Sequence, residues 1–308
     1  DYTPGIITSP VVVGSVVKGA SQIVGYNTGA LKIGERRYDT CIKIAATPLK
    51  CSWTYLGLLD DLTALKYSSN TYQFNTAIKV GKGNYTYNGP LSVDPMAFTT
   101  YRNTFAEFGL GVKTGIDLPV ESLGYKGEST NAGLLLDFSI GQYDTYTPIQ
   151  LSQYIGTIAN NGTRMQPYLL KEVYEPTKDG LTKLVSKTTP KELNKVNTKP
   201  EYLKRVQEGF KMVMEGNGTG VGHIDLAYKP AGKTGTSQSF IDSDGDGVVD
   251  KETITTTFAA YAPYDDPKVT FTVLSPDIYS YDNGSTYQTV VNRRISQEVS
   301  KKFFELYQ

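Results

Sequence analysis

Residues 15–18 read SVVK, residues 68–70 read SSN and residues 233–236 read KTGT, and this ordered set is the most informative feature of the chain. Each segment alone is weak, because patterns of three or four letters with free positions occur by chance in most chains of 308 residues. In this order and at these wide separations, the three segments together match the parts of a serine-based acyl-transfer site. They therefore predict a nucleophilic serine supported by lysine side chains.

The first segment pairs a nucleophile with a base. A serine hydroxyl is a poor nucleophile until a neighbouring base takes its proton. Ser15 and Lys18 are three residues apart, so on a helix they share a face and the amine can reach the hydroxyl. Lys18 acts as a base only if burial or a nearby cation lowers its pKa towards neutrality. Gly14 permits close packing, and a helix that starts at Ser15 directs backbone N–H groups at a developing oxyanion.

The second segment supplies a proton relay and an amide. In a non-helical loop Ser68 and Asn70 point the same way, so both can face one cleft. Ser68 would pass a proton between Lys18 and a departing amine, and Asn70 would bind both Lys18 and the substrate's peptide carbonyl. The segment taken alone equally fits an ordinary polar cap before the next helix.

The third segment has a competitor, because Lys-Thr-Gly occurs at residues 113–115 as well as at 233–235. The first copy runs into a proline-containing acidic stretch that indicates a loop, so we assign the site to residues 233–236. Lys233, Thr234 and Thr236 would hold a free carboxylate, and the Thr236 N–H would be the second oxyanion donor beside that of Ser15. Gly235 would let the substrate backbone approach an edge strand closely.

These motifs resemble those of the transpeptidase domain of high-molecular-weight class B penicillin-binding proteins. The similarity extends to TGIDLPVE at 114–121, GQ at 141–142, TPIQL at 147–151 and NNGT at 160–163. The resemblance implies an α+β fold related to serine β-lactamases, with a central antiparallel sheet flanked by helices. It implies a D,D-transpeptidase that cross-links peptidoglycan stem peptides, is acylated by β-lactams and requires no cofactor. Family members often have proline where Val13 stands, a departure expected to alter the entry turn rather than the chemistry.

Two alternatives share this fold and these motifs: a non-catalytic penicillin sensor and a serine β-lactamase. Class A β-lactamases add a Glu-x-x-Leu-Asn pattern after the second motif, whereas this chain has only Glu192-Leu193-Asn194, far downstream and wrongly spaced. Sensors of the class D type usually lack asparagine at the position of Asn70. Both differences favour the synthetic enzyme.

The resemblance also bears on domain organisation and location. No repeat or low-complexity linker divides residues 1–308, which we interpret as one transpeptidase domain. Ser15 lies unusually near the first residue, since such domains normally carry two strands and a helix upstream, together with a pedestal domain and a membrane anchor. We therefore expect Asp1 not to be the biological N-terminus, and we expect the protein to act at the extracytoplasmic face of the membrane. Other cell-wall synthesis proteins are candidate partners.

Composition excludes several other functions. Lys plus Arg and Asp plus Glu both total 31, so no net charge favours nucleic acid. The sequence contains no run of about 18 apolar residues, the length needed to span a bilayer. His223 is the single histidine, so an imidazole-based triad or zinc site would have to use it, and no further metal ligands cluster beside it. We expect a structural role for it and a lysine as the base.

Helices are predicted at three places by apolar periodicity: after Thr147 up to residues 160–162, over 202–214 and over 287–307. The last would bury one apolar face against the core, formed by Val290, Val291, Ile295, Val299, Phe303 and Tyr307. Strands are predicted at 255–263 and 268–275 as an antiparallel hairpin, with the Lys233 strand beside it. Two short strands are predicted at 41–45 and 50–55.

Cys41 and Cys51 are the only cysteines. In an exported protein they could close a small loop, and in a cytosolic protein they would be two thiols. The resemblance implies export, but the sequence leaves both states open.

Residues 242–250 read DSDGDGVVD and match the first nine positions of an EF-hand-type calcium loop. Asp242, Asp244, Asp246 and Asp250 are the candidate ligands of a structural Ca²⁺. Thr253 replaces the usual glutamate at position twelve, so a solvated acidic turn is the alternative.

Overall fold

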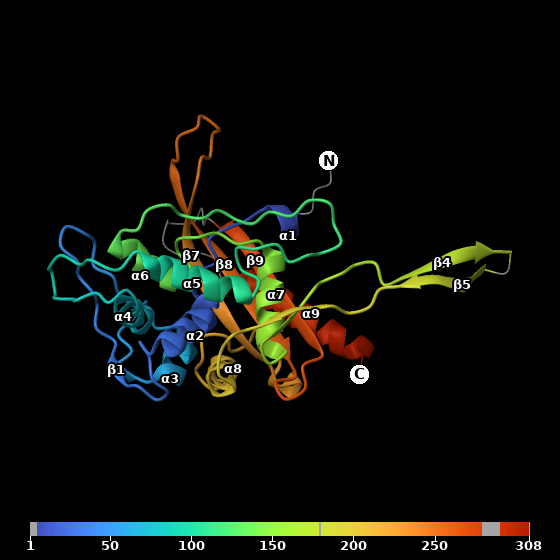
Figure 1. The fold of residues 1–308 in the computed structure, drawn as a ribbon, viewed down its shortest axis with the longest axis horizontal. Helices are drawn as coiled ribbons and strands as arrows, with labels where there is room; N and C mark the ends of the chain where they lie inside the picture. Colours follow the sequence, from blue (N-terminus) through green and yellow to red (C-terminus); the bar gives the residue numbers. More distant parts are fainter. Residues whose placement is uncertain (1–4, 179, 279–289, 308) are drawn as a thin grey trace.

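The computed structural model describes residues 5–178, 180–278 and 290–307 (Figure 1). Up to the middle of the chain it contains α1 (Gly5–Thr8), the 3-10 helix η1 (Gly14–Val17), α2 (Lys18–Thr28), β1 (Arg37–Tyr38), β2 (Leu58–Leu59), α3 (Asp61–Lys66), α4 (Asn70–Val80), α5 (Met96–Glu107), α6 (Ala132–Ser139) and α7 (Pro148–Ala159). There follow β3 (Thr163–Met165), β4 (Glu172–Thr177), β5 (Gly180–Lys187), β6 (Glu192–Lys195), α8 (Pro200–Met214), the 3-10 helix η2 (Leu226–Tyr228), β7 (Ala231–Ile241), β8 (Lys251–Ala262), β9 (Val269–Ile278) and α9 (Val290–Tyr307). Within the described ranges, no helix is both long and apolar enough to cross a membrane.

The main sheet is antiparallel and has the strand order β7-β8-β9, which confirms the predicted α+β class and the predicted neighbours of the Lys233 strand. β8 is the central strand and is buried along almost its whole length. β7 lies at an edge of this sheet, in register through Lys233 with Ala259 and through Thr236 with Thr256. The third motif therefore has an open strand edge beside it.

Helix α2 is the central helix of the fold, because nearly all of its residues are buried. It contacts α4, α5 and α8 around its circumference and continues directly from η1, which contacts β7 and β8. The first motif lies at the junction of η1 and α2, so the core of the molecule fixes its position relative to the sheet.

Helices α7 and α8 follow the predicted pattern. Thr147 caps α7 in a capping box with Gln150, and α7 ends at Ala159, just before the Asn-Asn-Gly stretch. Helix α8 begins at Pro200 and buries the apolar stripe Leu203, Val206, Phe210 and Val213. Figure 1 shows β4 and β5 as a hairpin that projects far from the body.

The predicted orientation of the last helix is wrong. Val291 and Ile295 are each 41% exposed and Tyr307 is 75% exposed, whereas α9 buries Asn292, Ser296, Ser300 and Phe304. The small hydroxyl side chains bring the helix close to the sheet, and Asn292 accepts a hydrogen bond from Ser275 of β9 at 2.6 Å. The Ser296 hydroxyl donates a hydrogen bond to the Asn292 carbonyl of its own helix, so this buried polar group keeps a partner. Residues 287–289 of the predicted helix lie outside the described residues.

The two strands predicted around Thr47-Pro48 are also wrong. Only one isolated bridge, between Ile42 and Lys50, joins these segments. Cys41 and Cys51 form a disulfide with their Cα atoms 4.4 Å apart, so the segment is a cross-linked loop rather than a hairpin of regular strands. We call residues 41–51 the disulfide loop.

Removing this cross-link should destabilise the protein. The disulfide joins residues with a sequence separation of 10 and restricts the unfolded chain. Replacing both cysteines by serine removes this restriction, which should lower the free energy of unfolding by about 2–3 kcal/mol. Urea denaturation measures this loss, and a reductant should reproduce it in the wild type but not in the double variant. Equal stability of the oxidised wild type and the double variant would contradict the assignment.

Candidate active site

Ser15 lies in the 3-10 turn η1 and Lys18 is the first residue of α2, so the nucleophile candidate is at a helix start as predicted. Gly14 has φ +63°, and a Cβ there would lie 2.5 Å from the backbone oxygen of Thr236. Glycine is thus required both for the backbone conformation and for the approach of β7. The Gly14 N–H donates to the carbonyl of Gly141 at 2.9 Å, and Gly141 is itself at φ +79°, where a Cβ would lie 2.2 Å from the Gly14 carbonyl oxygen.

The Lys18 amine is fully buried and contacts the second motif. It donates to the Ser68 carbonyl oxygen and to Asn70 Oδ1, both at 2.7 Å, and lies 3.3 Å from Ser68 Oγ. A neutral amine has two hydrogens and one lone pair. The two short bonds use both hydrogens, which leaves the lone pair to accept a proton. Among the described residues, the Lys18 amine makes no hydrogen bond to Ser15, and an apo geometry of this kind does not by itself rule out proton transfer between the two.

The pKa of Lys18 is well below its ordinary value, because burial disfavours the charged amine and the Lys233 charge repels it. Burial alone lowers the pKa of Lys233 to about 7. Lys233 Nζ lies 2.9 Å from Ser68 Oγ and also donates to the Thr234 carbonyl. Both lysine amines therefore contact the Ser68 hydroxyl. Lys233 is the nearby cation that was expected to help lower the pKa of Lys18.

The second motif both caps a helix and faces the cleft, so the two interpretations of it are compatible. Ser69 is the N-cap of α4 and accepts from the Tyr72 N–H, as in an ordinary polar cap. Ser68 precedes it at φ +57°, a conformation unusual outside glycine, and Asn70 starts the helix. The Asn70 Nδ2 group donates to the Cys51 carbonyl at 3.1 Å, so the disulfide loop fixes the amide orientation.

The third motif departs from expectation at Gly235. A Cβ there would lie 2.2 Å from Thr257 Oγ1 and 2.5 Å from the carbonyl oxygen of Val13. The glycine thus makes room for the segment that leads into Ser15, a reason for glycine that the sequence did not indicate, and Gly235 also lines the cleft. Thr236 is exposed, and Thr234 donates to Thr219 Oγ1 at 3.1 Å. The competing Lys-Thr-Gly at 113–115 lies in a loop, as predicted.

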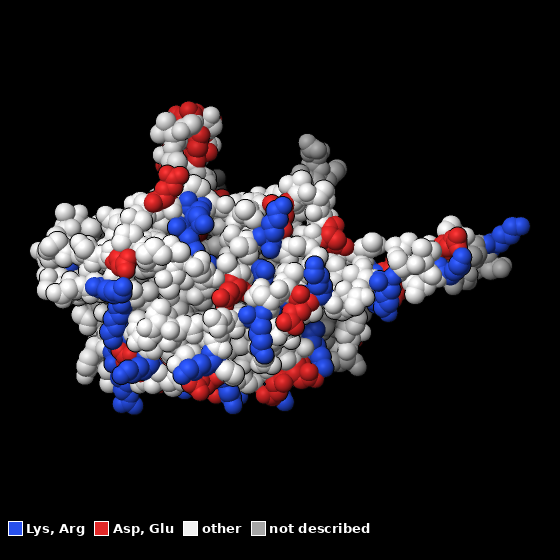
Figure 2. Space-filling view, in the orientation of Figure 1, with Lys and Arg blue, Asp and Glu red and all other residues white. Residues whose placement is uncertain are grey.

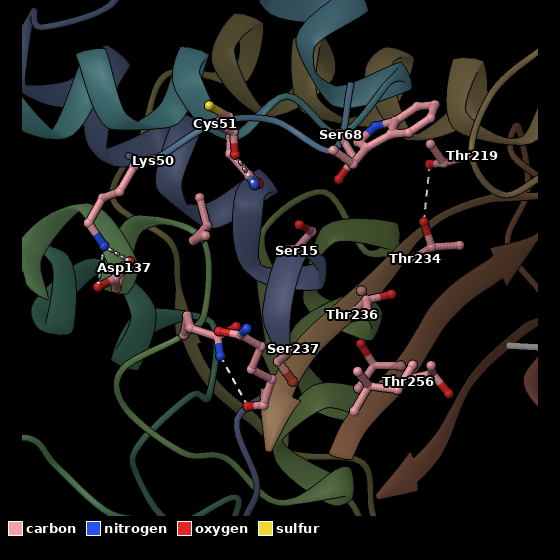
Figure 3. A pocket seen from close by; sticks show the side chains of 18 of the residues that line it. Ser15, Lys50, Cys51, Ser68, Asp137, Thr219, Thr234, Thr236, Ser237 and Thr256 are labelled. Carbon is pink, nitrogen blue, oxygen red and sulfur yellow. Dashed lines mark hydrogen bonds and ion pairs between the residues drawn. The ribbon is translucent and has the colours of Figure 1, made fainter. Parts of the chain in front are cut away.

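A cleft of about 1010 Å³ connects the three motifs. Figure 3 shows Ser15 between Ser68 on one side and Thr236 on the other, with Thr234 paired to Thr219. Sequence reasoning did not identify Thr219, Trp53 or the disulfide loop as cleft residues, because no local pattern marks them. His223 also lines the cleft, but its ring packs against that of Phe258 at a tilt of 31° with ring centroids 4.4 Å apart, in keeping with a structural role.

The acidic segment 242–250 forms the tip of the β7–β8 hairpin, where acidic side chains gather at the end of a protrusion (Figure 2). The carboxylate oxygens of Asp242, Asp244 and Asp246 lie within 4.8 Å of one another. Asp250, the fourth predicted ligand, is not part of this group, and its carboxylate accepts from the backbone N–H and hydroxyl of Ser243.

Comparisons with known proteins identify the family. Residues 1–296 match the penicillin binding protein transpeptidase domain. The chain is 47% identical over 309 residues to penicillin-binding protein 2A of Bacillus subtilis (strain 168), covering 99% of this chain and 43% of that protein. It is 38% identical over 310 residues to penicillin-binding protein H of the same organism, covering 99% of this chain and 42% of that protein. The solved structure of penicillin-binding protein 2B from Streptococcus pneumoniae (strain R6) superposes with a TM-score of 0.87 at 31% identity, covering 98% of this chain and 49% of that one.

The chain therefore belongs to the penicillin-binding protein transpeptidase domain family, as its three motifs predicted. It spans less than half the length of these relatives.

The buried amine of Lys18 generates a prediction about the base. Lys18→Arg keeps a positive charge but should lower the rate of acylation by a β-lactam about 100-fold or more, because guanidinium cannot lose its proton in a protein. Stopped-flow or intact-mass kinetics measure the rate. Lys50→Arg is the matched control: Lys50 also lines the cleft, and arginine can keep its ion pair with Asp137. Near-wild-type acylation by Lys18→Arg would exclude Lys18 as the base.

Proposed function

We propose that this chain is the transpeptidase domain of a D,D-transpeptidase that cross-links peptidoglycan stem peptides and is acylated by β-lactams. The observation that carries the proposal is the convergence of two buried lysine amines on Ser68, next to the half-buried Ser15 at the start of the central helix. The names of relatives from Bacillus subtilis and Streptococcus pneumoniae support penicillin binding.

In the proposed first step, the neutral amine of Lys18 takes the proton of the Ser15 hydroxyl while Oγ attacks the carbonyl carbon of the penultimate D-alanine. The N–H groups of Ser15 and Thr236 stabilise the oxyanion of the tetrahedral intermediate. Thr234, Thr236 and the Lys233 charge hold the terminal carboxylate. Asn70, which has one amide hydrogen beyond its bond to Cys51, positions the peptide carbonyl.

In the second step, the C–N bond breaks and Ser68 passes the proton from Lys18 to the departing D-alanine amine, which leaves an ester on Ser15. An amine from a neighbouring stem peptide then attacks this ester. Its proton returns through Ser68 and Lys18 to Ser15 as the new peptide bond forms. No metal or organic cofactor takes part in these proposed steps.

The same chemistry gives a prediction for the nucleophile. A fluorescent penicillin should label the wild type covalently, and Ser15→Ala should abolish labelling, because the attacking oxygen is gone. In-gel fluorescence measures the adduct. Ser9→Ala, which removes an exposed serine a few residues upstream, should label like the wild type. Labelling that persists in Ser15→Ala would assign the acyl group to another residue.

The lifetime of that adduct separates this function from its alternatives. A penicillin adduct followed by mass spectrometry over hours should persist in a transpeptidase or a sensor and disappear quickly in a β-lactamase. Release of D-alanine from a stem-peptide analogue then separates the enzyme from the sensor. A short-lived adduct would contradict the transpeptidase proposal.

We further propose that the domain acts at the extracytoplasmic face of the bacterial membrane, anchored through an upstream helix and near other cell-wall synthesis proteins. The Cys41–Cys51 disulfide supports this location, because such bonds persist in oxidising compartments.

A structural Ca²⁺ at the hairpin tip is a second, independent proposal. The three converging carboxylates of Asp242, Asp244 and Asp246 support it, whereas Asp250 is engaged by Ser243 and Thr253 is buried within β8. With so few ligands, the expected affinity is an extracellular-type Kd of about 10⁻⁴–10⁻³ M.

If this loop binds calcium, Ca²⁺ should raise the melting temperature from the millimolar range upward. At the expected Kd of about 10⁻⁴–10⁻³ M, the stabilisation should reach about 2.7 kcal/mol at a hundredfold excess over Kd, which is about 10–100 mM Ca²⁺. Differential scanning fluorimetry measures the shift. The double variant Asp242→Asn, Asp244→Asn should abolish it, and Mg²⁺ should substitute poorly because it demands a smaller octahedral site. An unchanged melting temperature at several millimolar Ca²⁺ would reduce the loop to an acidic turn.

A further inference from the structure

A buried carboxylate that the proposed mechanism does not use lies behind the second motif. Asp39 is 5% exposed, and its Oδ1 accepts hydrogen bonds from the hydroxyls of Ser52, Ser69 and Thr71 at 2.7, 2.6 and 2.5 Å. Its Oδ2 accepts from the backbone N–H of Leu56 at 3.3 Å. An ionised carboxylate is the side chain that can accept all of these donors and return none.

Two of these hydroxyls also serve the first turn of α4. Ser52 Oγ accepts from the backbone N–H groups of Asn70 and Thr71 at 2.9 and 3.4 Å. Ser69 Oγ accepts from the N–H of Tyr72 at 3.1 Å. Because each hydroxyl gives its single hydrogen to Asp39, its lone pairs are directed at the helix. The charge of Asp39 is thus connected through two hydroxyls to the positive end of α4.

This cap fixes the residues that hold the catalytic lysine. Ser68 and Asn70 flank the N-cap Ser69, and both of the short hydrogen bonds of the Lys18 amine go to them. Ser52 directly follows Cys51, whose carbonyl orients the Asn70 amide. Movement of the capped turn would therefore move both acceptors of Lys18 together.

We infer that Asp39 is a positioning residue for acylation: through Ser52 and Ser69 it holds the Ser68–Asn70 turn in the geometry that presents Lys18 to Ser15. It touches no reacting atom, and it acts through the hydroxyl relay and through its charge. The inference rests on the proposed function, because acylation of Ser15 is the step that it supports.

The charge of Asp39 gives a readout that a merely structural role would lack. The charged groups that affect the pKa of Lys18 are Lys233, which lowers it, and Asp39, which raises it, while burial lowers it most. Acylation requires neutral Lys18, so its rate falls as the pH drops through that pKa. Removing the negative charge lowers the pKa of Lys18 further, and the acidic limb of the pH–rate profile moves to lower pH.

The test compares Asp39→Asn, Ser52→Ala and Thr71→Val in penicillin acylation across pH, with circular dichroism as a check of folding. Asp39→Asn should lose about 10- to 100-fold in acylation rate at neutral pH, as expected for a misplaced catalytic group, and should shift the acidic limb to lower pH. Ser52→Ala should lose rate with the limb unmoved, because the charge stays while one link of the relay is removed. Thr71→Val is the matched control and should stay near wild type, because its hydroxyl accepts from no helix N–H in the described structure.

The outcomes separate the two proposals. A wild-type protein that forms no adduct would overturn the proposed function together with any role of Asp39 in it. A wild type that acylates, beside an Asp39→Asn variant with the same rate or an unmoved limb, would overturn the positioning role alone. Should Asp39→Asn fail to fold, Ser52→Ala decides: wild-type acylation by that variant would exclude the relay.

Discussion

Two lysine amines are buried against one serine hydroxyl, and the rest of the site depends on that arrangement. Lys18 and Lys233 are both fully buried, and each lies within 3.3 Å of Ser68 Oγ. Burying an ammonium group without a matching carboxylate is costly, so burial lowers the pKa of both amines, and the pKa of Lys18 is lowered further by the charge of Lys233. The fold thereby favours the neutral form of Lys18, which is the form that the proposed acylation requires. The desolvation that lowers the pKa of Lys18 requires that the amine be packed away from water. The position of Lys18 on the buried central helix α2 provides that packing.

Close approach of two backbones makes that packing possible. Gly14 and Gly235 each occupy a position where a side chain would collide with the opposite segment. Hydroxyl groups of the sheet then bind the segment before Ser15: Ser237 donates to the Val12 carbonyl at 2.7 Å and Thr257 to the Val13 carbonyl at 2.6 Å. These hydrogen bonds from the sheet therefore fix the position of Ser15 beside the edge strand β7.

The sequence predicted the elements whose chemistry is local. The three motifs, the capping box of α7 and the β8–β9 hairpin are each specified by neighbouring residues. The errors arose where tertiary packing overrides the pattern. Helix α9 buries serines because small residues allow close contact with β9, and the role of Gly235 depends on a segment more than 200 positions away. Asp39 could not be found in advance, since a single aspartate in a loop shows no sign of the hydroxyls that fold around it.

The mechanism depends on a neutral, buried Lys18 amine, and direct titration of that amine tests this requirement. NMR of protein carrying isotope-labelled lysine side chains follows each amine with pH, and loss of one signal in Lys18→Arg assigns the resonance. The Lys18 amine should titrate with a pKa well below the ordinary 10.5, and Lys233 should titrate with a pKa of about 7. A Lys18 amine that stays protonated up to about pH 10, as an exposed lysine does, would contradict this requirement.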